Sequence, residues 1–249
     1  MKSTVYTILS FAIALVIWQG IVMTGEFSPA LFPSPLDVAG AFGEIVSDGT
    51  LSDGITASLY RFVIGYVAAA VSGVAFGLLL GTSNAIFRLV NPVIQLLRPI
   101  APVAWMPFIV LLIGIGDAPA IVIIFLAGFF PVLTTTARAV HHVDEVYLKV
   151  AANYGISRVR TIFQIILPAI FPQIANSLHI ALGSAWIFLV SGEMVGTQSG
   201  LGYMIIDARN NMRPDILIAV MIVIGIIGFL LDLLIGRCER QVSVLWGRK

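Results

Sequence analysis

The sequence has little charge and almost no cysteine. Only 11% of its 249 residues are charged, whereas an ordinary soluble domain carries roughly 25%. So few charged residues cannot cover a water-exposed surface when 59% of the chain is hydrophobic. The hydrophobic residues occur in runs of about 20, the length that a helix needs to cross a membrane. We therefore expect an all-α integral membrane protein with lipid around most of its outside.

Other absences exclude whole classes of function. The formal net charge is only +1 and no run of Lys and Arg occurs, so nucleic acid is not an expected partner. The single cysteine, Cys238, can form neither an internal disulfide nor a multi-thiolate metal site. The sequence also lacks the P-loop pattern G-x-x-x-x-G-K-[ST] and the zinc pattern H-E-x-x-H. We expect no cofactor or metal bound by this chain, and no ATP hydrolysis of its own.

About six transmembrane helices are predicted from continuous apolar runs. Continuous runs favour helices over a β-barrel, whose strands alternate in hydrophobicity. The first run exceeds the core of a signal peptide and lacks a small-residue cleavage site, so a retained helix is expected. We expect an N-terminal helix with its outer loop over residues 1–57 and a five-helix domain over residues 58–249. The predicted spans are 4–24, 62–80, 100–115, 119–137, 174–196 and 216–236.

The distribution of basic residues predicts the orientation. With the N-terminus in the cytoplasm, all Lys and Arg residues except Arg61, Arg209 and Arg213 lie in cytoplasmic segments, as the positive-inside rule requires. Both termini are therefore expected inside. The segment 25–57 is acidic without any basic residue. Because Pro33 and Pro35 should break a regular helix, we expect an irregular outer loop there.

The segment 138–173 is the one long cytoplasmic insertion, between predicted helices four and five. Residues 146–154 have the pattern of a short helix, and Gly155 can take the left-handed conformation that ends it. Ser157 is suited to cap a second helix. That helix would have an apolar face of Val159, Ile162, Phe163 and Ile166. A helix, a turn and a helix are thus expected at the cytoplasmic surface.

The spacing of this insertion resembles the EAA loop of ABC importer permeases, which reads E-A-A, three residues, Gly, nine residues, Ile-x-Leu-Pro. In that family the short helix couples the permease to its ATP-binding subunit. The resemblance implies ATPase-coupling roles for Lys149, Val150, Ala151, Ala152, Asn153, Tyr154 and Gly155, and structural roles in the loop for Leu167 and Pro168. Lys149 and Val150 replace the family's Glu and Ala, so the contact on the ATPase is expected to differ in detail.

Further stretches resemble the branch of permeases that serves sulfonate, taurine, nitrate and bicarbonate importers. They are 58–61, 92–107, 193–195, 200–203 and 232–246. The resemblance implies a type I permease in a prokaryotic inner membrane, with a second copy of the chain and an extracytoplasmic solute-binding protein. Two ATP-binding subunits would use ATP and Mg. The implied cargo is a small oxyanion, with a vitamin or pyrimidine precursor as the alternative.

Polar residues inside the predicted spans are candidates for the translocation pathway. Glu193 is an ionisable residue in an apolar run, which favours either a pathway role or a structural hydrogen bond. Ser184 and Ser191, on the same predicted helix, are also assigned to the pathway. Asp232 is expected to pair with a basic residue such as Arg237 as the last helix leaves the membrane.

An intramembrane enzyme is the alternative from a different class. It would use Glu193 or the adjacent His141 and His142, which lie close to Asp144 and Glu145. Adjacent histidines point to different faces of a helix, so these four residues are better explained as a solvated entry to the short helix than as a metal site. The sequence also lacks a nucleophile elbow and a recognisable acid and base pair.

A stripe of glycines recurs in the second predicted span. Its members lie four or eight residues apart and so share one helix face. Such small residues allow a neighbouring helix to approach closely, and we expect a packing role for Gly65, Gly73, Gly77 and Gly81.

Overall fold

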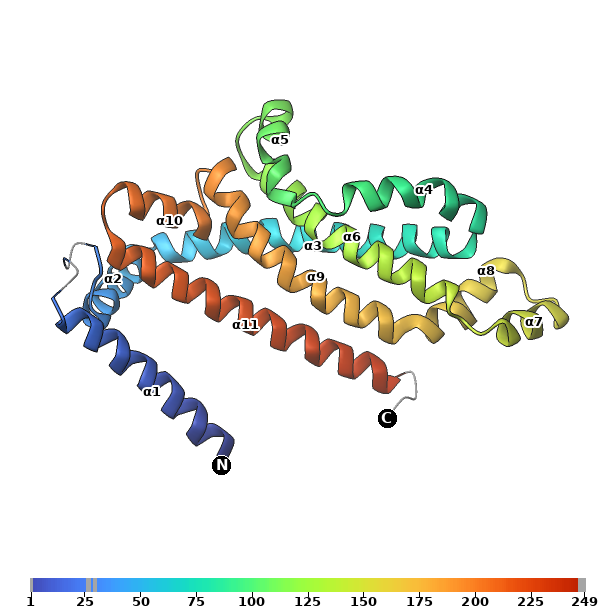
Figure 1. Cartoon of the computed structure of the whole chain (residues 1–249), viewed down its shortest axis with the longest axis horizontal. Coiled ribbons are helices and arrows are strands. Elements are labelled where there is room, and N and C mark those ends of the chain that lie inside the picture. Colours follow the sequence, from blue (N-terminus) through green and yellow to red (C-terminus); the bar gives the residue numbers. More distant parts are fainter. Residues whose placement is uncertain (1, 26–27, 29–30, 246–249) are drawn as a thin grey trace. The chain divides into compact units, whose positions relative to one another are not determined.

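The computed structural model describes residues 2–25, 28 and 31–245, and all regular structure in these ranges is helical (Figure 1). The chain divides into two compact units. Unit 1 comprises Met1–Ser58 and Ser199–Ile226, and unit 2 comprises Leu59–Gln198 and Ile227–Lys249. The predicted division into residues 1–57 and 58–249 stays a prediction.

Unit 1 contains α1 (Lys2–Met23), α2 (Pro35–Ser47), the first residues of α3 (Thr50–Thr82), α10 (Leu201–Asn210) and the first half of α11 (Pro214–Leu245). The indole Nε1 of Trp18 on α1 donates a hydrogen bond to the carbonyl of Pro33, at 3.1 Å. This contact ties α1 to the segment that leads into α2.

The prediction of an irregular loop over residues 25–57 was wrong, because α2 lies within it. Pro35 occupies the start of the helix, where its missing N–H has no helical partner to lose and its fixed φ is already helical. Ser34 Oγ accepts from the Asp37 N–H at 3.2 Å, and the Asp37 carboxylate accepts from the Ser34 N–H at 2.9 Å. This reciprocal cap begins the helix. The hydrogen bonds from Ser34 hold the pKa of Asp37 below its ordinary value.

Unit 2 is built around α6 (Asp117–His141), which packs along α9 (Leu167–Gly196). Ile123, Ile124 and Val132 of α6 are fully buried. The other elements of this unit are the rest of α3 and α11, α4 (Asn84–Leu97), the 3-10 helix η1 (Pro102–Trp105), α5 (Met106–Ile113), α7 (Glu145–Asn153), α8 (Arg158–Thr161) and the π-helix η2 (Ile162–Ile166).

The glycine stripe of α3 has the predicted packing role, and the helix that it faces is α6. A Cβ added at Gly65, Gly73, Gly77 or Gly81 would lie 2.7, 2.9, 2.5 or 2.4 Å from side-chain carbons of Ile124, Val132, Thr136 and Val140, respectively. Real Cβ atoms essentially never come so close to other atoms. Small residues therefore allow the two helices to touch at these four positions.

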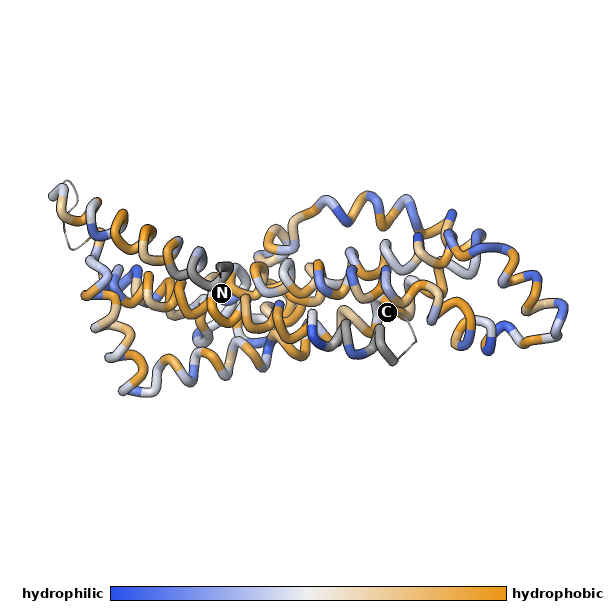
Figure 2. Tube along the Cα trace, turned by 90° about the horizontal axis from the view of Figure 1, so that it is seen from below, coloured by the Kyte–Doolittle hydropathy of each residue, from blue (hydrophilic) through white to orange (hydrophobic). Residues whose placement is uncertain are grey.

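Four helices are long and apolar enough to cross a membrane: Thr50–Thr82, Asp117–His141, Arg158–Gly196 and Pro214–Arg237. They contain the predicted spans 62–80, 119–137, 174–196 and 216–236. The apolar part of α1, Leu9–Met23, is shorter. Figure 2 shows that the long helices are hydrophobic over most of their length, which suits contact with lipid.

The predicted continuous span over residues 100–115 was wrong. The chain instead forms a pair of helices, Asn84–Leu97 and Pro102–Ile113, which are bent by 85° at the break between them. Pro99 and Pro102 explain the break, because proline removes a backbone donor and disfavours a helical conformation in the residue before it. Counting the bent pair as one span gives five spans in the described residues, and the number six stays a prediction.

Candidate functional site

The predicted coupling segment forms the three-turn helix α7, Glu145–Asn153. Asp144 caps its start, since the carboxylate accepts a hydrogen bond from the Val146 N–H at 2.9 Å. At its end, the Ile156 N–H donates to the Ala151 carbonyl and the Gly155 N–H donates to the Ala152 carbonyl, both at 3.0 Å. Gly155 has φ +68°. These bonds and the left-handed glycine form a Schellman motif, so the predicted helix stop is confirmed.

Most side chains of α7 are exposed, including large apolar ones. Val146, Tyr147, Val150 and Tyr154 lie on one side of the helix by spacing, and we call them the α7 surface; Tyr154 is 82% exposed. Exposed apolar residues that gather on one face of a short helix are a candidate surface for a protein partner.

The seven predicted coupling residues are not equally available to a partner. Ala151 is only 1% exposed and packs inside this chain, whereas Ala152 and Asn153 are exposed. The Lys149 ammonium lies 2.8 Å from the Glu145 carboxylate, and both side chains are largely exposed. The basic residue that departs from the family pattern therefore has an acidic neighbour one turn earlier.

Leu167 and Pro168 join the insertion to α9. The Leu167 N–H donates to the Ile162 carbonyl, five residues back, which widens the turn into the π-helix η2. Pro168 follows in the first turn of α9, where a missing N–H is tolerated. Leu167 packs against a buried cluster that includes Ile166, Ile170 and Val140. Although Ser157 precedes α8 as predicted, its side chain makes no capping hydrogen bond.

A buried arginine connects three helices in unit 2. Arg61 of α3 is only 2% exposed. Its Nη1 lies 2.6 Å from Oε1 of Glu193 on α9, and its Nε lies 2.7 Å from Oδ1 of Asp117 at the start of α6. The Glu193 side chain is fully buried, whereas that of Asp117 is 56% exposed. Beside this cluster the Gly116 N–H donates to the Gly196 carbonyl at 2.9 Å.

This geometry gives Glu193 the structural hydrogen bond that was one of its two predicted roles. A fully buried carboxylate needs a paired cation, and Arg61 supplies it. The pathway role of Glu193 stays a prediction. Sequence reasoning missed the partnership because 132 residues separate the two positions. The sequence did offer one indication of this pair. Arg61 and Glu193 are both charged residues in or next to apolar runs, and both are predicted near the same face of the membrane.

Ser184 borders a recess between the α4–α5 bend, α6 and α9. The recess has a volume of about 180 Å³, and we call it the outer recess after the orientation predicted from the sequence. The Ser184 hydroxyl donates to the Ile180 carbonyl at 3.1 Å. The lining residues are Arg98, Ile100, Pro102, Trp105, Leu126, Ala127, Phe130, Pro131, Ser184 and Phe188. Ser191 is partly exposed and donates to the Ile187 carbonyl; it does not line this recess.

A second, smaller recess lies between α3, α4 and α6. This inner recess has a volume of about 40 Å³ and shares Arg98 with the outer one. Its walls are partly polar. They comprise Leu80, Phe87, Asn91, Ile94, Gln95, Arg98, Leu133, Thr134, Ala137 and Arg138. Sequence reasoning did not single out any of these polar residues for function, because the bend between α4 and α5 that brings the two recesses together was not predicted.

The remaining polar candidates have local partners. Asp232 Oδ1 lies 2.6 Å from Nε2 of His179 on α9, so Asp232 has the predicted structural pairing, with this histidine as its partner instead of Arg237. The His141 ring makes an edge contact with Phe87, and His142 Nδ1 lies 2.8 Å from the Arg138 carbonyl oxygen. Among the residues that the structure describes, no group of three His, Cys, Asp or Glu side chains could hold a metal ion.

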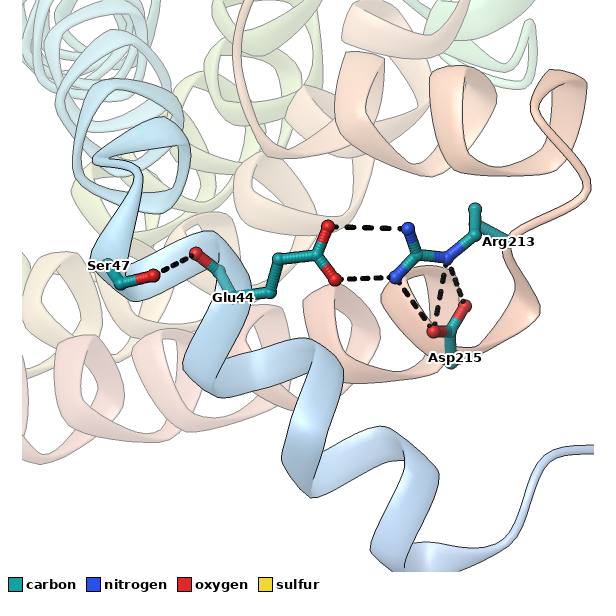
Figure 3. Close-up of polar contacts among 4 residues, drawn as sticks. All are labelled: Glu44, Ser47, Arg213 and Asp215. Carbon is teal, nitrogen blue, oxygen red and sulfur yellow. Dashed lines mark hydrogen bonds and ion pairs between the residues drawn. The ribbon is translucent and has the colours of Figure 1, made fainter.

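Unit 1 carries an ion cluster around Arg213 (Figure 3). Its Nη2 lies 2.7 Å from Glu44 Oε2 and 2.9 Å from Asp215 Oδ2, so one guanidinium joins α2 to the start of α11. The hydrogen bond to Glu44, followed by that to Asp215, raises the pKa of Arg213 above its ordinary value. The residue before it, Met212, has φ +54°.

The sequence and fold are similar to those of known transport proteins. A sequence model described as the binding-protein-dependent transport system inner membrane component matches residues 73–244. The taurine transport system permease protein TauC of Escherichia coli strain K12 is 32% identical, over 97% of this chain and 90% of that protein. The nitrate import permease protein NrtB of Leptolyngbya laminosa is 31% identical, over 97% and 88%.

A third relative is the putative aliphatic sulfonates transport permease protein SsuC of Bacillus subtilis strain 168, which is 32% identical over 93% of this chain and 84% of that protein. Among solved structures, a chain of the MetNI methionine ABC transporter in an inward-facing conformation matches with a TM-score of 0.69. The match covers 79% of this chain and 97% of that chain at 20% sequence identity, so it concerns the fold.

Proposed function

This chain belongs to the family of binding-protein-dependent transport system inner-membrane components, and we propose that it forms the membrane path of an ATP-driven importer for a small oxyanion. The observation that supports this cargo is the similarity, at 31–32% identity over nearly the whole chain, to permeases named for taurine, nitrate and aliphatic sulfonates. These solutes share a compact, negatively charged oxygen-bearing group. A vitamin or pyrimidine precursor remains the alternative cargo.

The ATP-binding subunit is proposed to dock on the α7 surface. Tyr147, Val150 and Tyr154 offer exposed apolar and aromatic area, the kind that contributes most to protein interfaces. Two ATP-binding subunits would bind ATP with Mg, since this chain has no P-loop. The chain would then be a non-catalytic subunit that receives movement from them.

Movement at α7 has a short structural route to the far end of unit 2. The chain runs from α7 through α8 and the π-helix into α9, without an extended linker. Near the other end of α9, Glu193 holds Arg61 of α3. We propose that displacement of α7 shifts α9 and, through this ion pair, α3. Packed helices transmit such shifts because closely packed contacts have little room to deform.

The same proposal implies two further protein partners and an orientation in the membrane. A second copy of the chain would complete the path, and a solute-binding protein would deliver the cargo on the extracytoplasmic side. Both termini would be cytoplasmic in a prokaryotic inner membrane, because the Lys and Arg distribution favours this orientation. The acidic α2, with Asp37 and Glu44, would then lie outside.

The cargo can be tested by deleting the gene from its host and measuring uptake of labelled taurine, methanesulfonate, nitrate and a pyrimidine precursor. We expect uptake of one of the three oxyanions to fall to background and to return with the wild-type gene. Loss restricted to the pyrimidine precursor would replace the proposed cargo with the alternative. Unchanged uptake of all four would refute the oxyanion assignment.

A further inference from the structure

Arg98 is a cation without an ion-pair partner among the described residues, and it stands where the two recesses of unit 2 meet. It follows the last residue of α4, at the break before Pro102, and its side chain is exposed. Exposure leaves this guanidinium available to a solute. Its guanidinium presents a planar set of donors that matches the oxygens of a sulfonate or nitrate.

The walls of both recesses favour an anion. Within the described chain, neither recess is lined by Asp or Glu. The inner recess adds a second arginine, Arg138, together with the side-chain amides of Asn91 and Gln95. The outer recess is also bordered by Ser184, whose hydroxyl donates to the Ile180 carbonyl and would have to rotate to donate to an anion. Cations that line a cleft with low-dielectric walls raise the local concentration of anions.

The dimensions and the apolar walls limit the kind of anion. The outer recess, at about 180 Å³, has room for a molecule of several heavy atoms, since a water occupies about 30 Å³ in the liquid. Trp105 and Phe188 provide apolar surface for a short carbon chain. The inner recess, at about 40 Å³, holds much less. A small organic or inorganic oxyanion fits these limits better than a large or cationic solute.

From these observations we infer that the outer and inner recesses are two successive binding sites on an anion-selective path, and that Arg98 contributes to both. This inference rests on the proposed function as an importer and adds the residues that select the charge of the cargo. Ser184 keeps its predicted pathway role in this arrangement. Arg138 and Gln95 then receive the anion from Arg98 on the inner side.

The inference can be tested with cysteine-directed probes of opposite charge on the assembled transporter in detergent. In a Cys238→Ser background, which removes the single native cysteine, Ser184→Cys places a thiol in the outer recess and Thr134→Cys places one in the inner recess. The probes are the sulfonate-bearing and the trimethylammonium-bearing ethyl methanethiosulfonates. The readout is the ratio of the two modification rates, which needs neither ATP nor a known cargo.

We expect Arg98→Gln to lower the anionic-to-cationic rate ratio by about tenfold at both thiols, the size of effect that a unit charge several ångströms away produces in a partly hydrated site. The matched control is Arg88→Gln, which removes an exposed arginine of α4 that lines neither recess and should leave the ratio unchanged. An unchanged ratio in Arg98→Gln, an equal fall in Arg88→Gln, or no modification of either thiol would overturn the inference. Because uptake is not measured, failure here is distinct from failure of the oxyanion uptake experiment.

Discussion

Arg61 and Glu193 form a buried ion pair across unit 2, with 2.6 Å between Nη1 and Oε1 and with almost no exposure of either side chain. Asp117, the second carboxylate on this arginine, is half exposed. The two acidic partners therefore differ in what their removal should do. Loss of a buried partner leaves a charge without compensation, whereas water can replace an exposed one.

Glu193→Ala should destabilise the protein by about 3 to 5 kcal/mol, because it removes the buried carboxylate that pairs with the buried Arg61 charge. Asp117→Ala should cost about 1 kcal/mol or less, as expected for a pair with one exposed member. Thermal unfolding of the detergent-solubilised transporter measures both. Equal losses in the two variants would contradict the assignment of Glu193 as the principal partner.

Gly155→Pro should uncouple ATP hydrolysis from uptake. Proline cannot adopt the φ of +68° found here, so the Schellman motif that ends α7 would be lost. Gly155→Asn is the matched control, because asparagine tolerates the left-handed conformation better than other residues with a Cβ. The measurements are membrane insertion, ATPase activity and uptake. Normal uptake in the proline variant would show that the end of α7 does not carry coupling.

Val150→Glu should weaken binding of the ATP-binding subunit at least tenfold, because it places a charge in the centre of the apolar α7 surface, where interfaces are depleted of charge. Val46→Glu is the control, since Val46 is also an exposed valine but lies on α2. Co-purification from detergent, with the ATP-binding subunit quantified per permease, compares the two. Full recovery with Val150→Glu would place the docking surface elsewhere.

Met212→Gly should stabilise unit 1 by about 0.5 to 1 kcal/mol, because Met212 has φ +54° and glycine adopts this conformation without steric cost. The neighbouring Asn211 has an ordinary φ of −86°, so Asn211→Gly should stabilise nothing and instead increase the entropy of the unfolded chain. Chemical unfolding followed by a fluorophore on unit 1 distinguishes them. A lower midpoint for Met212→Gly would show that its side chain makes stabilising contacts.

The cap of α2 should weaken in acid. Hydrogen bonds from Ser34 lower the pKa of Asp37 in the folded protein below its ordinary value of 3.8. A lowered pKa contributes stability that is present above the unfolded value and is lost as the pH falls through the folded value. Hydrogen exchange at the start of α2, corrected for the intrinsic rate, should therefore rise below about pH 4. Asp37→Asn should remove this pH dependence, and its persistence would point to another group.

Much of the fold was predictable because a chain in lipid must satisfy its backbone hydrogen bonds internally, which favours long helices. Four long helices follow from continuous apolar runs, and a close helix contact on one face of α3 follows from the spacing of Gly65, Gly73, Gly77 and Gly81. The end of α7 was predictable for a local reason: only glycine readily takes the conformation found at Gly155. These features depend on residues close together in the sequence.

The features that were not predicted depend on proline position or on distant partners. Pro35 begins a helix rather than breaking one, and the Ser34 to Asp37 spacing of a capping box could have revealed this. By composition, residues 84–113 could form one membrane span, but the prolines at 99 and 102 divide them into two helices. The ion pair between Arg61 and Glu193 joins positions that no local pattern connects.

The glycine stripe has a mechanical consequence for any transport cycle. Because side chains of α6 fill the hollows left by four glycines of α3, sliding of one helix along the other would make these atoms collide. The two helices form a tightly packed pair, and we expect them to move together. We therefore expect flexing within unit 2 to occur beside this helix pair, foremost at the 85° bend between α4 and α5.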